Sequence, residues 1–152
     1  MTLDKLLEHG KEAAEHLFEK QGNVLPMWIA EDEAGTIAPI IMPLLEDKNK
    51  SATIIKQTLQ EIGAVRYVSI LEAWIYEPRK DEVDERYLSG EIPVREHPDR
   101  REVIMIVAED KRESISGLFY ILRPEHGEAK LSPFKELGRD TQSSGRFHGL
   151  LS

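Results

Sequence analysis

The stretch from Val65 to Tyr76 constrains the fold more than any other part of this chain. β-branched and aromatic residues dominate it, which is typical of a strand. Both alternating sides of the stretch are apolar: Val65, Tyr67, Leu71, Ala73 and Ile75 lie on one side, and Val68, Ile70, Trp74 and Tyr76 on the other. A strand of this kind requires cover on both faces. The sequence therefore predicts a central strand in a sheet.

Hydrophobic periodicity and capping residues place the other elements. Apolar residues recur at spacings of three and four over residues 2–21 and 47–62, which predicts two amphipathic helices. Thr2 and Gly22 match the caps of the first helix, and Gly63 matches the end of the second. In chain order, we expect a helix at 2–21, a hairpin at 25–32 and 36–42, a helix at 47–62, and strands at 65–76, 102–110 and 115–123.

The predicted hairpin contains two prolines, Pro26 and Pro39. Proline has no backbone N–H to donate to a neighbouring strand, so it is confined to edge strands and to non-bonding positions. We therefore expect the hairpin to lie towards an edge of the sheet, or its prolines to occupy positions that need no donor.

The order α-β-β-α-β-β-β predicts an α+β protein with a single antiparallel sheet of about five strands and two main helices. This order is similar to that of the roadblock/longin and profilin-like folds. The resemblance covers about residues 2–123. It lies in topology alone, so it implies a fold and assigns no functional residue.

The chain divides by composition into a domain and a tail. Residues 1–124 form the predicted α+β domain, which includes a long polar connection at 78–101. Connections of this length are functional or disordered in compact domains. Residues 125–152 contain recurring glycine and serine, and we expect an extended C-terminal tail there.

Charge and residue types exclude several classes of function. The net charge of -8 disfavours a nucleic-acid binding surface, which requires a basic face. No apolar run approaches the length of a membrane span, and the chain has no cysteine. His9 and His16 lie seven residues apart on the first helix, too far to share one ion easily. We therefore expect a cytoplasmic protein with no metal, no cofactor, no membrane and no nucleic-acid partner.

The strands carry more apolar surface than two helices on one face would cover. The residues that motivate this expectation are Trp74, Tyr76, Ile104, Ile106, Leu118 and Tyr120. The second face then needs the 78–101 connection, the tail or a second copy of the chain. A homodimer, or a sheet sealed by the tail, is the preferred hypothesis, with another protein as the alternative partner.

Glu72 is the residue within the central strand that most needs an explanation, because a buried carboxylate requires a partner. Residues 97–102 enter the next strand, and a hairpin arrangement would bring them close to Glu72 and Trp74. The candidate binding or ion-pair cluster is Glu72, Trp74, His97, Asp99, Arg100 and Arg101. Since Arg100 and Arg101 are adjacent on a strand, they should point to opposite faces.

Two functions remain open at this point. The preferred hypothesis is a non-enzymatic protein-interaction or self-associating module, in which Glu72 pairs with Arg100 or Arg101 and has a structural role. The alternative is a small-molecule-binding domain or hydrolase with a site near Glu72, His97, Asp99 and Arg101. No phosphate-binding loop and no nucleophile or metal-protease motif supports catalysis, so we name no catalytic residue.

Overall fold

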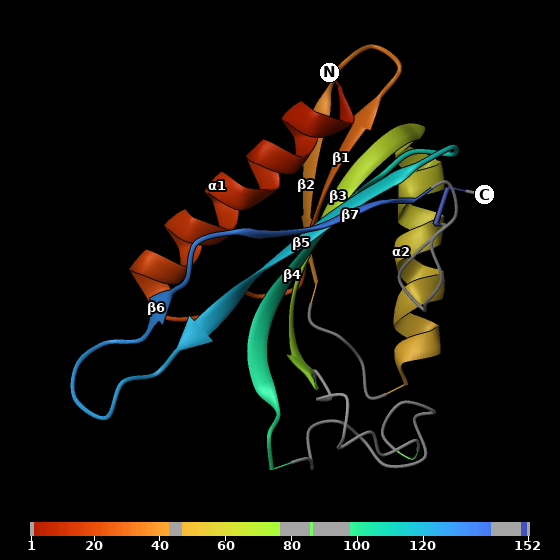
Figure 1. Cartoon of the computed structure of the whole chain (residues 1–152). Helices are drawn as coiled ribbons and strands as arrows, with labels where there is room; N and C mark the ends of the chain where they lie inside the picture. The colour runs from red at the N-terminus through yellow and green to blue at the C-terminus, as the bar shows by residue number, and fades with distance from the viewer. Residues whose placement is uncertain (1, 43–46, 77–85, 87–97, 141–149, 152) are drawn as a thin grey trace.

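The computed structural model describes residues 2–42, 47–76, 86, 98–140 and 150–151. Its described elements, in chain order, are α1 (Leu3–Gln21), β1 (Met27–Asp32), β2 (Ile37–Ile41), α2 (Lys48–Ile62), β3 (Ala64–Ile75), β4 (Arg101–Glu109), β5 (Ser114–Leu122), β6 (Lys130–Leu131) and β7 (Lys135–Asp140). The strands form one antiparallel sheet in the order β2-β1-β3-β4-β5-β6, and β7 also pairs with β5 (Figure 1). The predicted α+β class with a single antiparallel sheet is confirmed.

Local signals set the ends of both helices. The Thr2 side chain accepts a hydrogen bond from the Lys5 N–H at 3.2 Å, which caps the start of α1. Gly22 and Gly63 have φ values of 74° and 75° and end the two helices, as predicted. The second helix is capped by Asp47, whose carboxylate accepts two backbone N–H groups of the first turn.

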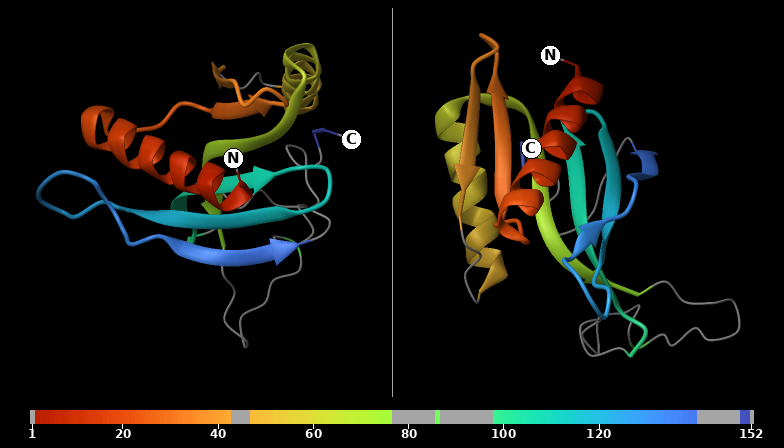
Figure 2. Two further views of the ribbon diagram at one scale, coloured as in Figure 1. Left: turned by 90° about the horizontal axis from the view of Figure 1, so that it is seen from above. Right: turned by 90° about the vertical axis from the view of Figure 1, so that its left-hand side faces the viewer.

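The two helices lie on opposite faces of the sheet (Figure 2). On the α1 face, Leu6 and Phe18 pack with Val68 of β3 and Ile106 of β4. Gly10 permits this close approach, because a Cβ atom there would lie 2.7 Å from the Val68 Cγ2 atom. The expectation that both helices cover one face of the sheet is therefore wrong. One helix packs against each of the two apolar faces of β3.

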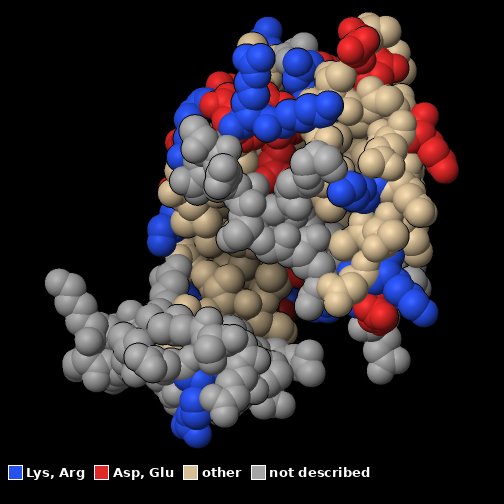
Figure 3. Space-filling view, turned by 90° about the vertical axis from the view of Figure 1, so that its right-hand side faces the viewer, with Lys and Arg blue, Asp and Glu red and all other residues tan. Residues whose placement is uncertain are grey.

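On the α2 face, Ile55 and Leu59 of the helix pack against Trp28 of β1 and Tyr67 of β3. Leu150, from the segment predicted as a tail, is buried in the same cluster. Part of the predicted tail therefore contributes to the core. Figure 3 shows the side of the molecule that carries α2, where charged groups of both signs gather at one end of the described surface.

The two edges of the sheet are formed by the β1–β2 hairpin and by strands from the C-terminal part of the chain. The hairpin lies at one edge, with β2 outermost, and this agrees with the expectation drawn from its prolines. At the other edge, β6 and β7 come from residues assigned to the tail, so the sheet has more than the five strands expected. Their sequence lacks strict alternation because an edge strand leaves many of its side chains in water.

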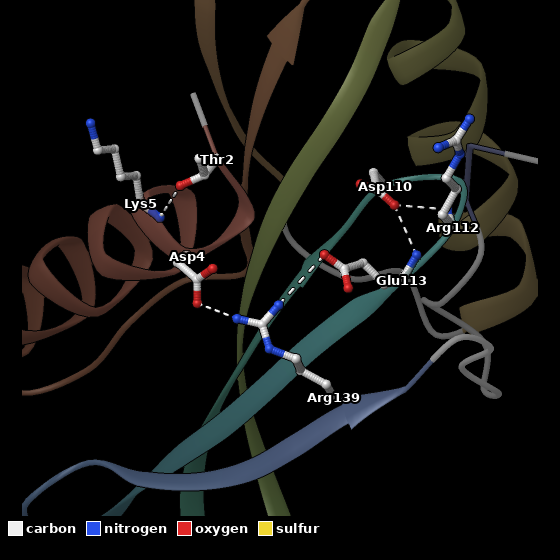
Figure 4. A network of polar contacts seen from close by, with 7 residues as sticks. All are labelled: Thr2, Asp4, Lys5, Asp110, Arg112, Glu113 and Arg139. Atoms are coloured by element: carbon white, nitrogen blue, oxygen red, sulfur yellow. Dashed lines mark hydrogen bonds and ion pairs between the residues drawn. The ribbon is translucent and has the colours of Figure 1, made fainter.

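Arg139 of β7 connects this edge to the first helix (Figure 4). Its guanidinium binds the Asp4 carboxylate in the first turn of α1 and lies 3.5 Å from the Glu113 carboxylate at the β4–β5 turn. Asp110 orders that turn by accepting the N–H groups of Arg112 and Glu113. The ion pairs of Arg139 are exposed, so they contribute little to the stability of the protein.

Neither helix in the described part of the chain has both the length and the apolar composition that crossing a membrane requires. The predicted connection at 78–101 falls mainly on residues outside those that the structure describes.

Candidate functional site

Glu72 lies on the α1 face of β3, beyond the end of the helix. Its carboxylate accepts a hydrogen bond from the backbone N–H of Val24 at 2.6 Å. The side chain is exposed, so the expectation of a buried carboxylate is wrong. Because α1 ends at Gln21 and β3 continues past it, the helix does not cover this part of the strand. Glu72 fixes the segment that follows α1.

The two adjacent arginines of the predicted cluster stack on different aromatic rings. The Arg100 guanidinium lies 4.9 Å from the centre of the Trp74 ring, and the Arg101 guanidinium lies 3.8 Å from the centre of the Tyr120 ring. Trp74 and Tyr120 belong to opposite faces of the sheet by strand alternation. The arginines therefore diverge, as alternation predicts, and do not form one clamp.

Of the remaining members, Asp99 is exposed immediately before β4, and His97 lies outside the described residues. Register pairs Ile75 with Arg101 and Trp74 with Glu102, so the start of β4 does lie beside the end of β3. The structure thus brings Trp74 and Arg100 together and places Arg101 on the other side of the sheet.

An ion pair that the sequence did not reveal lies next to Trp74. Glu102 accepts two hydrogen bonds from the Arg123 guanidinium, and the Nη2–Oε1 distance is 3.3 Å. The hydrogen bonds to Glu102 raise the pKa of Arg123 above its ordinary value, and the charge of Glu72 acts in the same direction. A small cavity of about 210 Å³ opens here, lined by Glu72, Ala73, Trp74, Glu102, Val103 and Ile121.

A larger cavity of about 670 Å³ lies between the C-terminal end of α1 and the β5–β6 hairpin. Its apolar surface comes from Phe18, Ala129 and Leu131. Its charged side chains are Glu15, Glu19, Lys20, Arg123, Glu128 and Lys130. The volume falls within the range of small-molecule sites, and charges of both signs above an apolar floor suit an amphipathic ligand.

The buried polar groups of the described core lie outside the lining of these two cavities. Glu31 of β1 is 2% exposed and pairs with Arg66, directly opposite on β3. On the α2 face, the buried Tyr67 hydroxyl donates to the buried Glu109 carboxylate. Sequence reasoning missed Glu109, although it continues the alternation of Val103, Met105 and Val107 and so points toward the same face.

Burial raises the pKa of Tyr67 far above its ordinary value, and the neighbouring Glu109 charge and hydrogen bond act in the same direction. The backbone of Leu150 acts in the opposite direction and lowers this pKa in part. Tyr67 therefore stays protonated in the folded protein at pH values at which the unfolded chain begins to release this proton.

The difference between the pKa of Tyr67 in the folded protein and in the unfolded chain predicts a loss of stability at alkaline pH. The folded pKa is raised, so the contribution of Tyr67 is fully present below the unfolded value of 10.0 and decreases as pH rises above it. The expected slope is roughly 1.4 kcal/mol per pH unit above about pH 10. Urea unfolding between about pH 8 and 11.5 should show a shallower alkaline decline for Tyr67→Phe than for wild type. Equal slopes for the variant and the wild type would contradict the assignment.

The histidines of α1 do not take part in a metal site among the described residues. His9 and His16 are exposed, and no group of three histidine, cysteine, aspartate or glutamate side chains gathers in the part of the chain that the structure describes.

Comparison with known proteins adds no assignment to this geometry. The chain matches no protein-family model, and neither the curated proteins nor the solved structures gave a match. The function therefore has to be argued from the surfaces and cavities of this chain.

Proposed function

We propose that this chain is a non-enzymatic, cytoplasmic protein-interaction module that associates with a second copy of itself. The observation that carries the proposal is an apolar surface on the edge hairpin, which we name the β2 shelf and define by Leu25, Ile37, Pro39 and Ile41. All four side chains are exposed, and Ile41 is 58% exposed. Contiguous exposed apolar side chains are typical of an interface.

The position of α1 explains why the shelf is uncovered. The helix contacts β3, β4 and β5, so it does not extend over β2. Ile37, Pro39 and Ile41 alternate onto the α1 face of the sheet, opposite Glu31, Ile29 and Met27 of β1. Partly buried Ala13 and Leu17 form the flank of the helix that faces this hairpin. The shelf is thus the part of the α1 face that the helix leaves open.

The pattern of the shelf suits a two-fold arrangement. Ile37 and Ile41 lie two residues on either side of Pro39, so rotation about an axis at Pro39 brings Ile37 of one copy against Ile41 of the other. A two-fold interface uses the same surface on both copies and therefore requires such self-complementarity.

Charges at the two ends of the shelf support the same arrangement. The exposed Glu33 lies in the hairpin turn at one end, and the exposed His16 and Lys20 lie near the C-terminal end of α1. At about 100° per helical residue, both basic side chains lie on the flank that contains Ala13 and Leu17. A two-fold axis across the shelf directs the acidic turn of each copy toward His16 and Lys20 of the other, on the flank of α1 away from Glu15.

The backbone of β2 favours packing by side chains over addition of a strand. The backbone N–H of Asp32 donates to the Thr36 carbonyl, and the backbone N–H of Met42 donates to the Pro26 carbonyl. The even-numbered residues of this hairpin therefore direct their backbone N–H and C=O groups at the partner strand. The backbone groups of Ile37, Pro39 and Ile41 then point outward from the edge of the sheet, where Pro39 has no N–H to donate. Proline at such a position protects a sheet edge.

This surface differs from the one expected from sequence. Ile104 and Ile106 are buried beneath α1, and Leu118 is also buried, so they do not form an exposed patch. The similarity of the element order to the roadblock/longin and profilin-like folds accords with an interaction module, and the additional strands β6 and β7 extend that order.

Sedimentation at micromolar concentration tests the proposal. We expect a dimer for the wild type and a monomer for Ile37→Glu/Ile41→Glu, because the substitutions place four carboxylates in the apolar interface. The matched control is Ile54→Glu on α2, where an isoleucine of similar exposure lies on the other face. The control should remain dimeric, and all variants should retain the wild-type thermal transition. A wild type that is monomeric throughout would refute self-association.

A second candidate function is the binding of a small molecule, and the cavity of about 670 Å³ is the observation that favours it. Glu72 lies beside the smaller neighbouring cavity, with Trp74 in its lining. Ligand-observed NMR with a set of small amphipathic molecules is the measurement that addresses this function.

A further inference from the structure

The α2 face holds a residue from a distant part of the chain. Leu150 is buried among Trp28, Ala30, Ile55, Leu59 and Tyr67, and we name the space formed by these five residues the leucine socket. The five residues come from β1, α2 and β3. The walls of the socket are therefore made by elements far from Leu150 in the sequence.

Leu150 enters the socket without belonging to a helix or strand. Leu150 and Leu151 form a turn, and Leu151 is partly buried against the same cluster. Leu150 and Leu151, the described residues of this part of the chain, belong to no strand. The contact that the structure shows for them is the burial of their side chains in the socket.

One wall of the socket carries a polar group. The Tyr67 hydroxyl lies in the socket and donates to the Glu109 carboxylate. Both Tyr67 and Glu109 are buried. A purely apolar packing site would need no such pair, since burying polar groups is costly unless they are satisfied. The socket thus has apolar walls for a leucine side chain, and the tyrosine hydroxyl in its wall is already paired inside the protein.

We propose that the leucine socket is a binding site for an extended or turn-forming peptide that contains leucine, and that Leu150 is its intramolecular ligand. The socket recognises the leucine side chain. A peptide of another chain that offers a leucine competes with Leu150. The socket lies on the opposite face of the sheet from the β2 shelf, so this inference does not depend on self-association.

A peptide with the sequence of residues 147–152, Phe-His-Gly-Leu-Leu-Ser, is the probe. The full-length variant Leu150→Gly/Leu151→Gly vacates the socket, and fluorescence anisotropy of the labelled peptide measures binding. We expect the variant to bind the peptide at least about tenfold more tightly than the wild type, whose socket is occupied by a tethered ligand of high effective concentration. A control peptide with aspartate in place of the first leucine should not bind.

Several results would overturn the proposal. A folded variant that does not bind the peptide would show that Leu150 is only a core residue. Equal binding by wild type and variant would place the peptide elsewhere. If the variant does not fold, methyl-labelled wild-type protein provides the second measurement: excess peptide should shift the Leu150 methyl signals to the positions of an unfolded chain. Failure to displace them at several-millimolar peptide, roughly the effective concentration of a short tether, would contradict the proposal.

Discussion

Replacing Trp28 by alanine is expected to lower the free energy of unfolding by about 3–5 kcal/mol. Trp28 is fully buried on the α2 face, where it packs with Ile55 and Leu59 of the helix. Removing the indole leaves a cavity that the sheet and helix cannot close, because both are fixed by other contacts. Urea unfolding followed by far-ultraviolet circular dichroism measures the loss without using tryptophan fluorescence.

Trp74 provides the matched control for this prediction. It is 41% exposed, and its described contact is the Arg100 guanidinium over its ring. Trp74→Ala should therefore cost about 1 kcal/mol or less, which is the scale of an exposed cation–π contact. Similar losses for the two tryptophans would contradict the placement of Trp28 in the core and Trp74 at its margin.

The contrast between the two tryptophans shows how far the sequence could predict the core. Alternation correctly places Val68 and Ile70 on one face of β3 and Tyr67 on the other, and all three are buried. The same alternation continues through Trp74, which is exposed. Strand periodicity gives the direction of a side chain, but whether it is covered depends on where the overlying helix ends.

The helices and the hairpin could be predicted because their signals are local. Thr2, Gly22 and Gly63 act within one turn of the residues they cap. Which face each helix covers depends on tertiary packing, and no local signal distinguishes the two faces of a strand that is apolar on both. The strands β6 and β7 were missed for a related reason: their pairing with β5 supplies order that their own residues do not encode.

The sequence likewise predicted only part of the candidate site. Alternation predicted that Arg100 and Arg101 diverge, and they stack on rings of opposite faces. The expected burial of Glu72 failed because α1 does not extend over it. The buried carboxylates Glu31 and Glu109 lie near the ends of strands, where a charged residue in the sequence usually marks exposure. Their long-range partners Arg66 and Tyr67 distinguish them from ordinary surface acids.

Removing Arg66 should be the most damaging change to a charged residue of the described core. Glu31 is 2% exposed and Arg66 is 28% exposed, so the carboxylate depends on its partner more than the guanidinium does. Arg66→Leu leaves Glu31 buried beside an apolar side chain, and we expect a loss of about 3 kcal/mol in the free energy of unfolding. Glu31→Leu should cost less, because the Arg66 guanidinium reaches water along its flexible stem.

The double variant Glu31→Leu/Arg66→Leu removes both members of the ion pair. Its stability shows how much of the loss in Arg66→Leu comes from removing one charge while the other stays buried. It removes both charges and places apolar side chains on neighbouring strands, so its stability should lie within about 1 kcal/mol of the wild type. Urea unfolding of both single variants and the double variant gives the coupling energy directly. Asp4→Asn, which removes a partner of Arg139 at a solvated surface pair, should leave the transition unchanged. A double variant as unstable as Arg66→Leu would mean that the loss comes from packing of the arginine stem and not from breaking the Glu31–Arg66 ion pair.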